Sequence, residues 1–309
     1  MMRVAMHNPG RSKKTDNAES PPAGNTVSST TKANIETMRR VLPAGACDCH
    51  AHVYGPFVDY PLPIAVPFKP PLASIEALER LWETFGIERG VIVQGSAYGQ
   101  DHRALLAAIR RAPENRRGVA LMGPDTPDAR LDQLQTSGVR GARMNFVRHL
   151  GNGFDETRCR QVVRRIEPFG WHLEVHVEAD DLERLQRFVQ ESPVNIVIDH
   201  MGRVDATKGL NQAPFRALLK LISNPHCWVK LSGADRLAKQ GVLETAVAFA
   251  RALIETAPDR VVWGSDWPHV NLNRSYGDEA LFSLLPEIAP DDLSRKRLLV
   301  DNPAILYGF

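Results

Sequence analysis

Short apolar runs and helical patterns alternate along this chain, and this alternation limits the fold more than any other feature of the sequence. Eight runs of five to seven residues, rich in Val, Ile and Leu, predict parallel strands that are covered on both faces. The predicted strands are residues 47–53, 90–94, 118–122, 141–147, 171–177, 195–199, 227–232 and 260–264. The predicted helices are residues 74–85, 102–112, 127–136, 156–167, 179–190, 214–222, 241–256 and 291–299.

Eight strands, each followed by a helix, predict a (β/α)8 TIM barrel that forms a single domain over residues 45–309. An open doubly wound sheet is the alternative, but no Gly-rich phosphate-binding loop follows the first strand. Residues 1–35 are rich in Ser, Thr, Asn, Lys and Pro and hold almost no large apolar residue after Val4. They cannot bury enough apolar surface to offset the entropy lost on ordering, so a disordered polar arm is expected.

Charge and composition argue against several kinds of partner. A net charge of +2 over 309 residues gives no reason to expect nucleic acid or an anionic membrane surface. The sequence has no run of 18 apolar residues, so no membrane span is expected. The N-terminal arm lacks the apolar core of a secretory signal. The four cysteines form no C-x-x-C pair, which is typical of a reduced setting, so a cytoplasmic protein is expected. A homo-oligomer is compatible with all of these features.

Polar residues stand at the carboxyl ends of predicted strands, where (β/α)8 barrels carry their chemistry. His50 and His52 are two residues apart, so on a strand they project from the same face. His176, His200 and Asp266 come at the ends of three further predicted strands. A single histidine of this kind is most simply a buried core residue. Four histidines and an aspartate at strand ends indicate an active site.

Four motifs carry a resemblance to a known family: Asp-Cys-His-Ala-His at 48–52, Ile-Asp-His-Met-Gly-Arg at 198–203, Lys-Leu-Ser-Gly at 230–233 and Trp-Gly-Ser-Asp-Trp-Pro-His at 263–269. From about residue 45 onward the chain resembles the amidohydrolase superfamily. Within it, the sequence is most similar to the branch of lactone hydrolases that act on 2-pyrone-4,6-dicarboxylate or 4-sulfomuconolactone. This resemblance implies a small anionic lactone as the substrate.

The resemblance also implies the roles of the strand-end residues. Asp266 accepts a proton from the attacking water, while His50, His52 and His200 polarise the lactone carbonyl, directly or through a metal ion. This division agrees with the chemistry of the groups, because an ionised carboxylate only accepts protons, whereas imidazoles or a divalent cation stabilise an oxyanion.

A single zinc or similar divalent ion is the predicted cofactor. The predicted strand at 141–147 ends without the Lys or Glu that bridges two metals in binuclear members of the superfamily, so one ion or none is expected. Metal-free members of the branch carry a tyrosine where this chain has His176. The predicted ligands are therefore His50, His52, His176 and Asp266, which are ordinary zinc donors, with His200 as a further candidate. The alternative is that His176 hydrogen-bonds the substrate and no metal binds.

Several arginines near the strand ends suggest that the substrate is anionic, since a guanidinium binds carboxylate or sulfonate in two-pronged fashion. Each arginine alone could equally be a solvated surface charge. Hydroxyl, amide and imidazole groups nearby can add hydrogen bonds. The predicted substrate-binding residues are Arg143, Arg236, Arg203, Arg148, Ser96, Tyr54, Asn145 and His269. Cys47 and Cys49 alternate with the two histidines and are expected to face outward, toward helices.

Three other functions remain open at this point. Metal-dependent decarboxylases of the same superfamily also use an H-x-H pair and an aspartate after the last strand. An isomerase or hydrolase of sugar-acid lactones is a second alternative. A non-catalytic barrel that binds anions is a third, although such a protein has no need for Asp266 beside the histidines.

Overall fold

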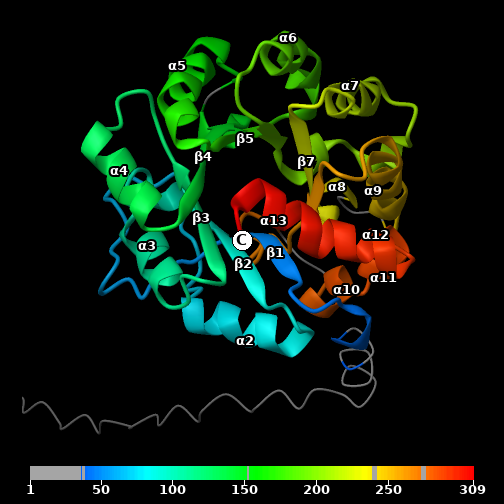
Figure 1. Cartoon of the computed structure of the whole chain (residues 1–309), viewed down its shortest axis with the longest axis horizontal. Helices are drawn as coiled ribbons and strands as arrows, with labels where there is room; N and C mark the ends of the chain where they lie inside the picture. Colours follow the sequence, from blue (N-terminus) through cyan, green and yellow to red (C-terminus); the bar gives the residue numbers. More distant parts are fainter. Residues whose placement is uncertain (1–35, 37–38, 152, 239–241, 273–275) are drawn as a thin grey trace, which may run out of the picture.

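The computed structural model describes residues 36, 39–151, 153–238, 242–272 and 276–309 (Figure 1). The predicted polar arm, residues 1–35, lies outside the described residues. No helix in the described part of the chain combines the length and the apolar character that crossing a membrane requires.

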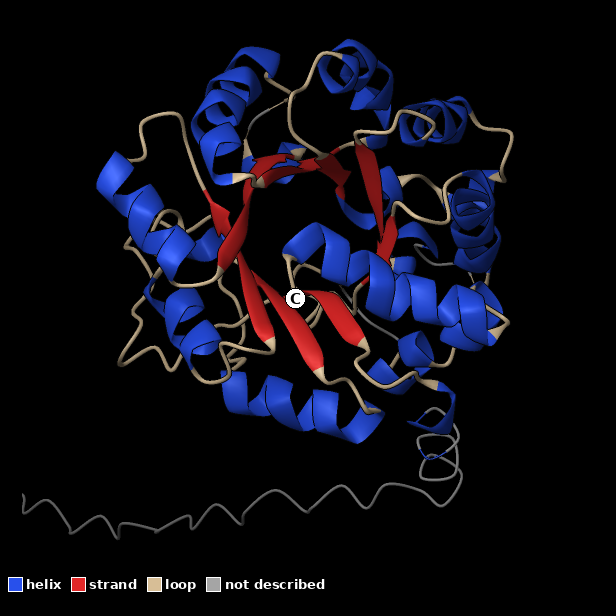
Figure 2. Cartoon of the chain, viewed as in Figure 1, coloured by secondary structure: helices blue, strands red, loops and turns tan. Residues whose placement is uncertain are grey.

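Eight parallel strands form one sheet in which neighbours follow the order of the sequence. Figure 2 shows them as a ring surrounded by helices, so the predicted (β/α)8 barrel is confirmed. A doubly wound sheet would reverse the strand order partway, and this sheet does not. The strands are β1 (Cys47–Ala51), β2 (Arg89–Val93), β3 (Arg116–Leu121), β4 (Val139–Phe146), β5 (His172–Val177), β6 (Ile196–Ile198), β7 (Cys227–Leu231) and β8 (Val261–Trp263).

Each of the eight predicted helices has a helical counterpart, two of them divided, whereas the short helices at Ala234–Ala238, Asp278–Phe282, Leu285–Ile288 and Asn302–Tyr307 were not predicted. The predicted helix at 179–190 consists of a 3₁₀ segment, η4 (Ala179–Arg184), followed by α6, and the one at 291–299 consists of α12 followed by a π-helical turn, η7 (Arg297–Asp301). The α-helices are α2 (Ile75–Phe85), α3 (Arg103–Arg110), α4 (Asp128–Thr136), α5 (Glu156–Ile166), α6 (Leu185–Gln190), α7 (Ala213–Ile222), α8 (Ala234–Ala238), α9 (Thr245–Thr256), α10 (Asp278–Phe282), α11 (Leu285–Ile288), α12 (Asp292–Lys296) and α13 (Asn302–Tyr307).

The barrel closes between β1 and the residues that follow β8. The backbone N–H of Asp266 donates to the carbonyl of His50 at 2.7 Å, and the N–H of His52 donates to the carbonyl of Trp267 at 2.8 Å. Ala51 and Trp267 form a parallel bridge at the same place. The closing hydrogen bonds therefore set the two histidines of β1 directly beside Asp266.

A buried carboxylate, Asp48, fastens this closure. Its Oδ1 accepts the backbone N–H groups of Ser265 at 2.9 Å and of His50 at 3.1 Å. Its Oδ2 accepts the Ser265 hydroxyl at 2.6 Å and the Trp82 indole N–H, from α2, at 3.0 Å. One side chain thus ties β1 to the strand-8 loop and to the first covering helix.

The C-terminal residues close the opposite end of the barrel, where the strands begin. Figure 1 shows α13 crossing this end. The ring of Phe309 lies under the guanidinium groups of Arg89 and Arg117, at 4.9 and 4.7 Å, and both arginines are at the beginnings of their strands. Tyr307 is fully buried, and its hydroxyl donates to Glu174 in the interior at 3.3 Å.

The expected outward orientation of Cys47 and Cys49 is wrong. Both pack in the interior cluster with Tyr307, and their sulfur atoms are 3.7 Å apart. The register of β1 against β2 shifts between Asp48 and Ala51, and this bulge interrupts the simple alternation of side chains. The strand can therefore turn both Cys49 and His50 inward.

Replacing Asp48 by Asn tests the importance of the closure. The amide would place an N–H₂ group against one pair of donors, so we expect the free energy of unfolding to fall by about 2–4 kcal/mol. Urea unfolding followed by circular dichroism measures this change. The matched control is Asp132→Asn on the exposed face of α4, which should change stability by less than about 0.5 kcal/mol. Equal stability of the two variants would contradict the role given to Asp48.

Candidate active site

Three imidazole groups surround one oxygen of Asp266 at the carboxyl ends of the strands. The Nε2 atoms of His50, His52 and His200 lie 3.8, 3.6 and 3.9 Å from Asp266 Oδ1. All four side chains are almost completely buried. These distances are too long for direct hydrogen bonds, so the four atoms enclose a position that a small polar group or an ion can occupy.

The second oxygen of Asp266 is already used. Arg236 donates its Nε–H to Oδ2 at 2.6 Å, whereas Oδ1 has no hydrogen-bond partner among the described residues. Burial alone would raise the pKa of Asp266, but the charge of Arg236 and the nearby histidines hold this pKa well below its ordinary value. Asp266 is therefore an ionised carboxylate whose Oδ1 is directed at the imidazoles.

The hydrogen bond of His52 fixes its tautomer. Its Nδ1 lies 2.7 Å from the backbone carbonyl of Val93, and a carbonyl can only accept. Nδ1 must therefore carry a proton. In the neutral ring, Nε2 then has a free lone pair that points toward Asp266 Oδ1.

His50 has the opposite arrangement because of Lys230. The Lys230 ammonium contacts the Cys49 carbonyl at 3.0 Å, Glu174 at 2.6 Å and His50 Nδ1 at 3.1 Å. The first two contacts are acceptors, so the third N–H is free to donate to His50 Nδ1, which leaves the proton of the neutral ring on Nε2. Burial, together with the charge of Lys230, lowers the pKa of His50 to about 3, so the ring is neutral. Its Nε2–H is a donor aimed into the site.

His200 and His176 complete the imidazole cluster. His200 pairs its Nδ1 with the Ser232 hydroxyl at 2.9 Å, and its backbone lies in the left-handed region at φ 51°. His176 has its Nε2 3.4 Å from the guanidinium of Arg203, and its ring centre is 5.1 Å from that of His200. Burial lowers the pKa of both rings well below the ordinary value, so both are neutral.

Beneath these groups lies a charge network that was not predicted from the sequence. Lys230 pairs with Glu174, and Arg143 donates its Nε–H to Asp199 at 2.8 Å. All four side chains are buried. The sequence feature that could have predicted this network is the position of these charged residues within otherwise apolar strands. Buried charges are tolerated only when they are paired, so each such residue requires a partner of opposite charge.

The pocket beside Asp266, called the catalytic pocket below for its proposed role, contains most of the predicted residues, together with five lining residues that were not predicted. The predicted residues that line it are His52, Tyr54, Ser96, Arg143, His176, His200, Arg236 and Asp266. His50 lies behind them and faces Asp266. The additional lining residues are Phe68, His149, Leu150, Val270 and Asn271, which come from loops and from the 3₁₀ segment at Arg148–Leu150 and follow no sequence pattern.

The other predicted substrate-binding residues do not line this pocket, although Arg203 lies beside it, against His176. Arg148 is exposed and pairs with Asp180 at 3.0 Å, outside this pocket. His269 is buried between Asp235, at 3.3 Å, and Asp278, at 2.9 Å, where it fixes the loop after β8. Asn145 lines a neighbouring pocket and donates to Ser96 at 2.8 Å, and Arg203 pairs with Glu178 at 3.4 Å.

The site offers ligands that fit a metal ion. His50, His200 and Asp266 each present one donor atom within 4.8 Å of the others. His52 adds a lone pair at Nε2, and its Nδ1–H is held by a carbonyl, which is the usual support for a metal-binding histidine. His176 fits less well, because the guanidinium of Arg203 occupies its Nε2. A second buried group, formed by His50, Glu174 and Asp199, already has Lys230 as its cation.

A barrel with an ionised carboxylate and neutral imidazoles at the carboxyl ends of its strands has the form of an enzyme site. The chain belongs to the amidohydrolase family, whose model matches residues 47–309.

Among similar proteins, a 2-pyrone-4,6-dicarboxylate hydrolase from Comamonas testosteroni is 39% identical over 89% of this chain and 94% of its own length. A 4-sulfomuconolactone hydrolase from Rhizobium radiobacter is 38% identical over 86% of this chain and 91% of its own length. A crystal structure of a putative 2-pyrone-4,6-dicarboxylic acid hydrolase from Pseudomonas putida superposes with a TM-score of 0.75 and 34% identity, covering 86% of this chain and 98% of that one. The predicted family and enzyme class, a hydrolase of carboxylic esters, are confirmed.

The buried neutral histidines predict that acid destabilises the fold. The unfolded chain protonates a histidine near pH 6.5, whereas folded His176 stays neutral, so stability is lost as the pH falls below about 6.5. In the metal-free protein, we expect His176→Gln to reduce the pH dependence of the unfolding free energy by about 1.4 kcal/mol per pH unit between pH 6 and 5. Urea titrations at each pH measure it. The exposed control His226→Gln should keep the wild-type slope, and an unchanged slope in both variants would contradict a neutral His176.

Proposed function

We propose that this protein hydrolyses a small anionic lactone, of the kind represented by 2-pyrone-4,6-dicarboxylate or 4-sulfomuconolactone. The observation that carries the proposal is the position of Asp266 Oδ1, which has no hydrogen-bond partner among the described residues and lies among the imidazoles of His50, His52 and His200. The relatives with these activities are similar over nearly their whole length, which supports the same reaction class here.

In the metal-free site, the nucleophilic water is held by two acceptors. His52 Nε2 and Asp266 Oδ1 are 3.6 Å apart and both present lone pairs, so a water can donate one hydrogen to each. Its oxygen then directs a lone pair at the substrate carbonyl. Asp266 takes the proton as the carbon–oxygen bond forms, while Arg236 keeps the carboxylate in place through Oδ2.

The lactone carbonyl is polarised by donors on the other side of the site. His50 Nε2–H is a preoriented donor, because Lys230 occupies Nδ1 and the strand fixes the ring. It stabilises the oxyanion of the tetrahedral intermediate. When the ring carbon–oxygen bond breaks, Asp266 returns its proton to the departing ring oxygen, and the product is the open-chain hydroxy acid or its keto tautomer.

Arginines next to the reacting position bind the anionic group of the substrate. Arg143 and Arg236 each use Nε for an internal carboxylate, which leaves N–H groups of the same guanidinium available at the pocket surface. Ser96 and Tyr54 line the same pocket and add hydroxyl groups. We assign no contact with the substrate to Arg148 or His269, because both side chains pair with acidic residues away from the reacting position.

We also propose that the imidazole cluster binds one zinc or similar divalent ion through His52, His200 and Asp266, whereas the Nε2–H of His50 remains a donor to the carbonyl. Neutral imidazoles with one carboxylate suit zinc, and the orphaned Oδ1 of Asp266 is available to it. When bound, such an ion polarises the carbonyl and makes a nearby water easier to deprotonate. His200 replaces His176 in this set because Ser232 leaves Nε2 of His200 free.

Replacing Asp266 by Asn tests the general base. The amide cannot accept the proton, so we expect kcat for 2-pyrone-4,6-dicarboxylate to fall by about 10²–10⁴-fold with the far-ultraviolet circular dichroism unchanged. Loss of pyrone absorbance measures turnover. Asp59→Asn, in an exposed loop, is the control and should retain wild-type activity. Chromatography of the product distinguishes an opened acid from the decarboxylated lactone, and release of carbon dioxide would contradict the proposed reaction.

Elemental analysis of the purified protein tests the metal. We expect about one zinc or similar ion per chain in the wild type and less than about one fifth of that in His200→Ala, because one of three ligands is lost. His226→Ala, an exposed histidine, should keep the wild-type content. Removing the ion by chelation should also lower the melting temperature of the wild type but not that of His200→Ala.

Less than about a tenth of an equivalent of metal, together with full activity in chelator, would contradict the proposed ion. The tautomer of His50 then gains in importance, because its Nε2–H would polarise the carbonyl directly.

A further inference from the structure

A second and larger pocket lies beside the catalytic one. The two share Ser96, Arg143 and Leu150 in their linings. The catalytic pocket holds about 30 Å³, the volume of a single water, whereas the neighbouring pocket holds about 300 Å³. We call the larger one the side pocket.

These volumes place the body of the substrate outside the catalytic pocket. A space of about 30 Å³ accommodates the attacking water but not a six-membered ring with its substituents. The side pocket lies at the lower end of the range usual for small-molecule sites, about 300–1,000 Å³. A lactone whose carbonyl reaches the imidazoles must therefore have its ring where the pockets join, and its substituent in the side pocket.

The charges of the lining residues indicate what that substituent carries. Arg143 and Arg236, beside the reacting position, already face Asp199 and Asp266. Arg158, in the first turn of α5, has no carboxylate within ion-pair distance among the described residues. Among the described residues that line the two pockets, Arg158 is therefore the one uncompensated cation that a second anionic group on the substrate can meet.

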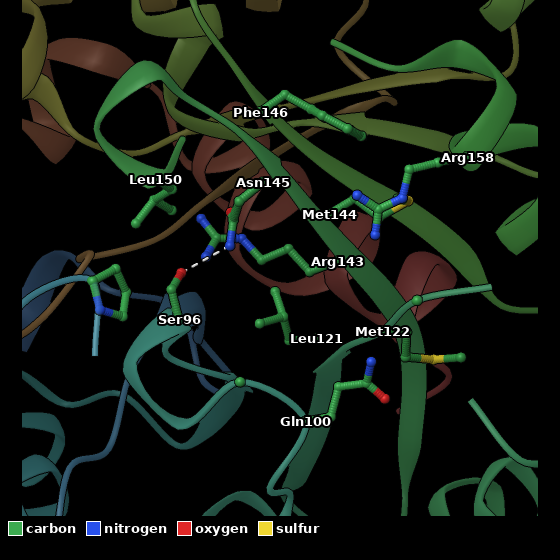
Figure 3. A pocket seen from close by; sticks show the side chains of 13 residues that line it. Ser96, Gln100, Leu121, Met122, Arg143, Met144, Asn145, Phe146, Leu150 and Arg158 are labelled. Carbon is green, nitrogen blue, oxygen red and sulfur yellow. Dashed lines mark hydrogen bonds between the residues drawn. The ribbon is translucent and has the colours of Figure 1, made fainter. Parts of the chain in front are cut away.

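The lining of the side pocket between Ser96 and Arg158 suits a short aliphatic substituent of the substrate. Figure 3 shows Ser96, Asn145 and Leu150 on one side of β4, and Arg158 on the other side near Met144. Met122, Met144 and Phe146 give the side pocket an apolar surface, and Asn145 Oδ1 has no hydrogen-bond partner among the described residues. Such a wall can contact methylene groups along its length before the guanidinium is reached.

We infer that the substrate is a lactone that bears, besides one anionic group near the reacting ring, a substituent several atoms long that ends in a carboxylate or sulfonate bound by Arg158. This inference rests on the proposed function and specifies its substrate class. Within the proposed class, a lactone with both anionic groups directly on the ring, such as 2-pyrone-4,6-dicarboxylate, is still hydrolysed but less efficiently, because its second charge cannot reach Arg158.

Matched synthetic lactones test this. The probes are 2-pyrone-6-carboxylates with a carboxypropyl chain, with the isosteric carbamoylpropyl chain or with no chain at position 4, and the same set with positions 4 and 6 exchanged. Arg158 is exposed, and an exposed ion pair contributes up to about 1 kcal/mol, so in one of the two sets the wild type should prefer the carboxylate chain over the amide by roughly three- to fivefold in kcat/KM. Arg158→Met should abolish this preference and leave kcat/KM for the amide unchanged.

The control is Arg164→Met, an exposed arginine on the same helix, which should keep the wild-type preference. The inference is overturned if the chainless lactone is the best substrate, or if Arg158→Met retains the preference for the carboxylate chain.

Binding by calorimetry separates this inference from the proposed reaction. Asp266→Asn, titrated with the same probes, should bind the carboxylate-chain lactone more tightly than the amide, with the difference removed by adding Arg158→Met. If no probe is hydrolysed by the wild type but this pattern holds, the proposed reaction is wrong and the role of the side pocket is right. If the probes are hydrolysed without any preference for the charged chain, the reaction is right and the role of the side pocket is wrong.

Discussion

The carboxylate of Asp48 is the interaction on which the active site depends. By accepting the N–H of His50 and both donors of Ser265, it joins the first strand to the chain that follows the last one. At the same closure, the backbone N–H of Asp266 donates to the His50 carbonyl. Groups more than 200 residues apart in the sequence are thereby brought within 4 Å, so barrel closure and assembly of the catalytic cluster are one event.

Pairing of buried charges gives the site its chemistry. Lys230 with Glu174, Arg143 with Asp199 and Arg236 with Asp266 form three cation–anion pairs in the interior. Burial lowers the pKa of His50, His176 and His200, so these three rings are neutral although charged pairs surround them. A neutral ring can donate from one nitrogen and accept at the other. Lys230 and the Val93 carbonyl use this property to give His50 and His52 opposite tautomers.

The sequence predicted the barrel and its strand-end residues because both follow from local patterns: apolar runs for the strands and i, i+2 spacing for His50 and His52. It could not predict what depends on distant partners. His269 was predicted to bind the substrate, but its ring lies between the distant carboxylates of Asp235 and Asp278. The bulge in β1, which turns Cys49 inward, leaves no mark in the residue types. In the sequence, nothing distinguishes Arg148 from Arg158. In the fold, Arg148 pairs with Asp180, whereas Arg158 lines the side pocket.

This contrast separates catalysis from specificity within the barrel. The reacting groups stand on strand ends that hydrogen bonds hold in register, so they leave little room for adjustment beyond a water-sized space. The side pocket is built partly from loops and from the start of α5, where a change of residue disturbs no strand. A barrel of this kind can keep one set of catalytic residues and change its substrate by altering the charge at a position such as 158. Lactone opening and substrate choice are then carried by different residues, and the choice depends on a cation that has no carboxylate partner among the described residues.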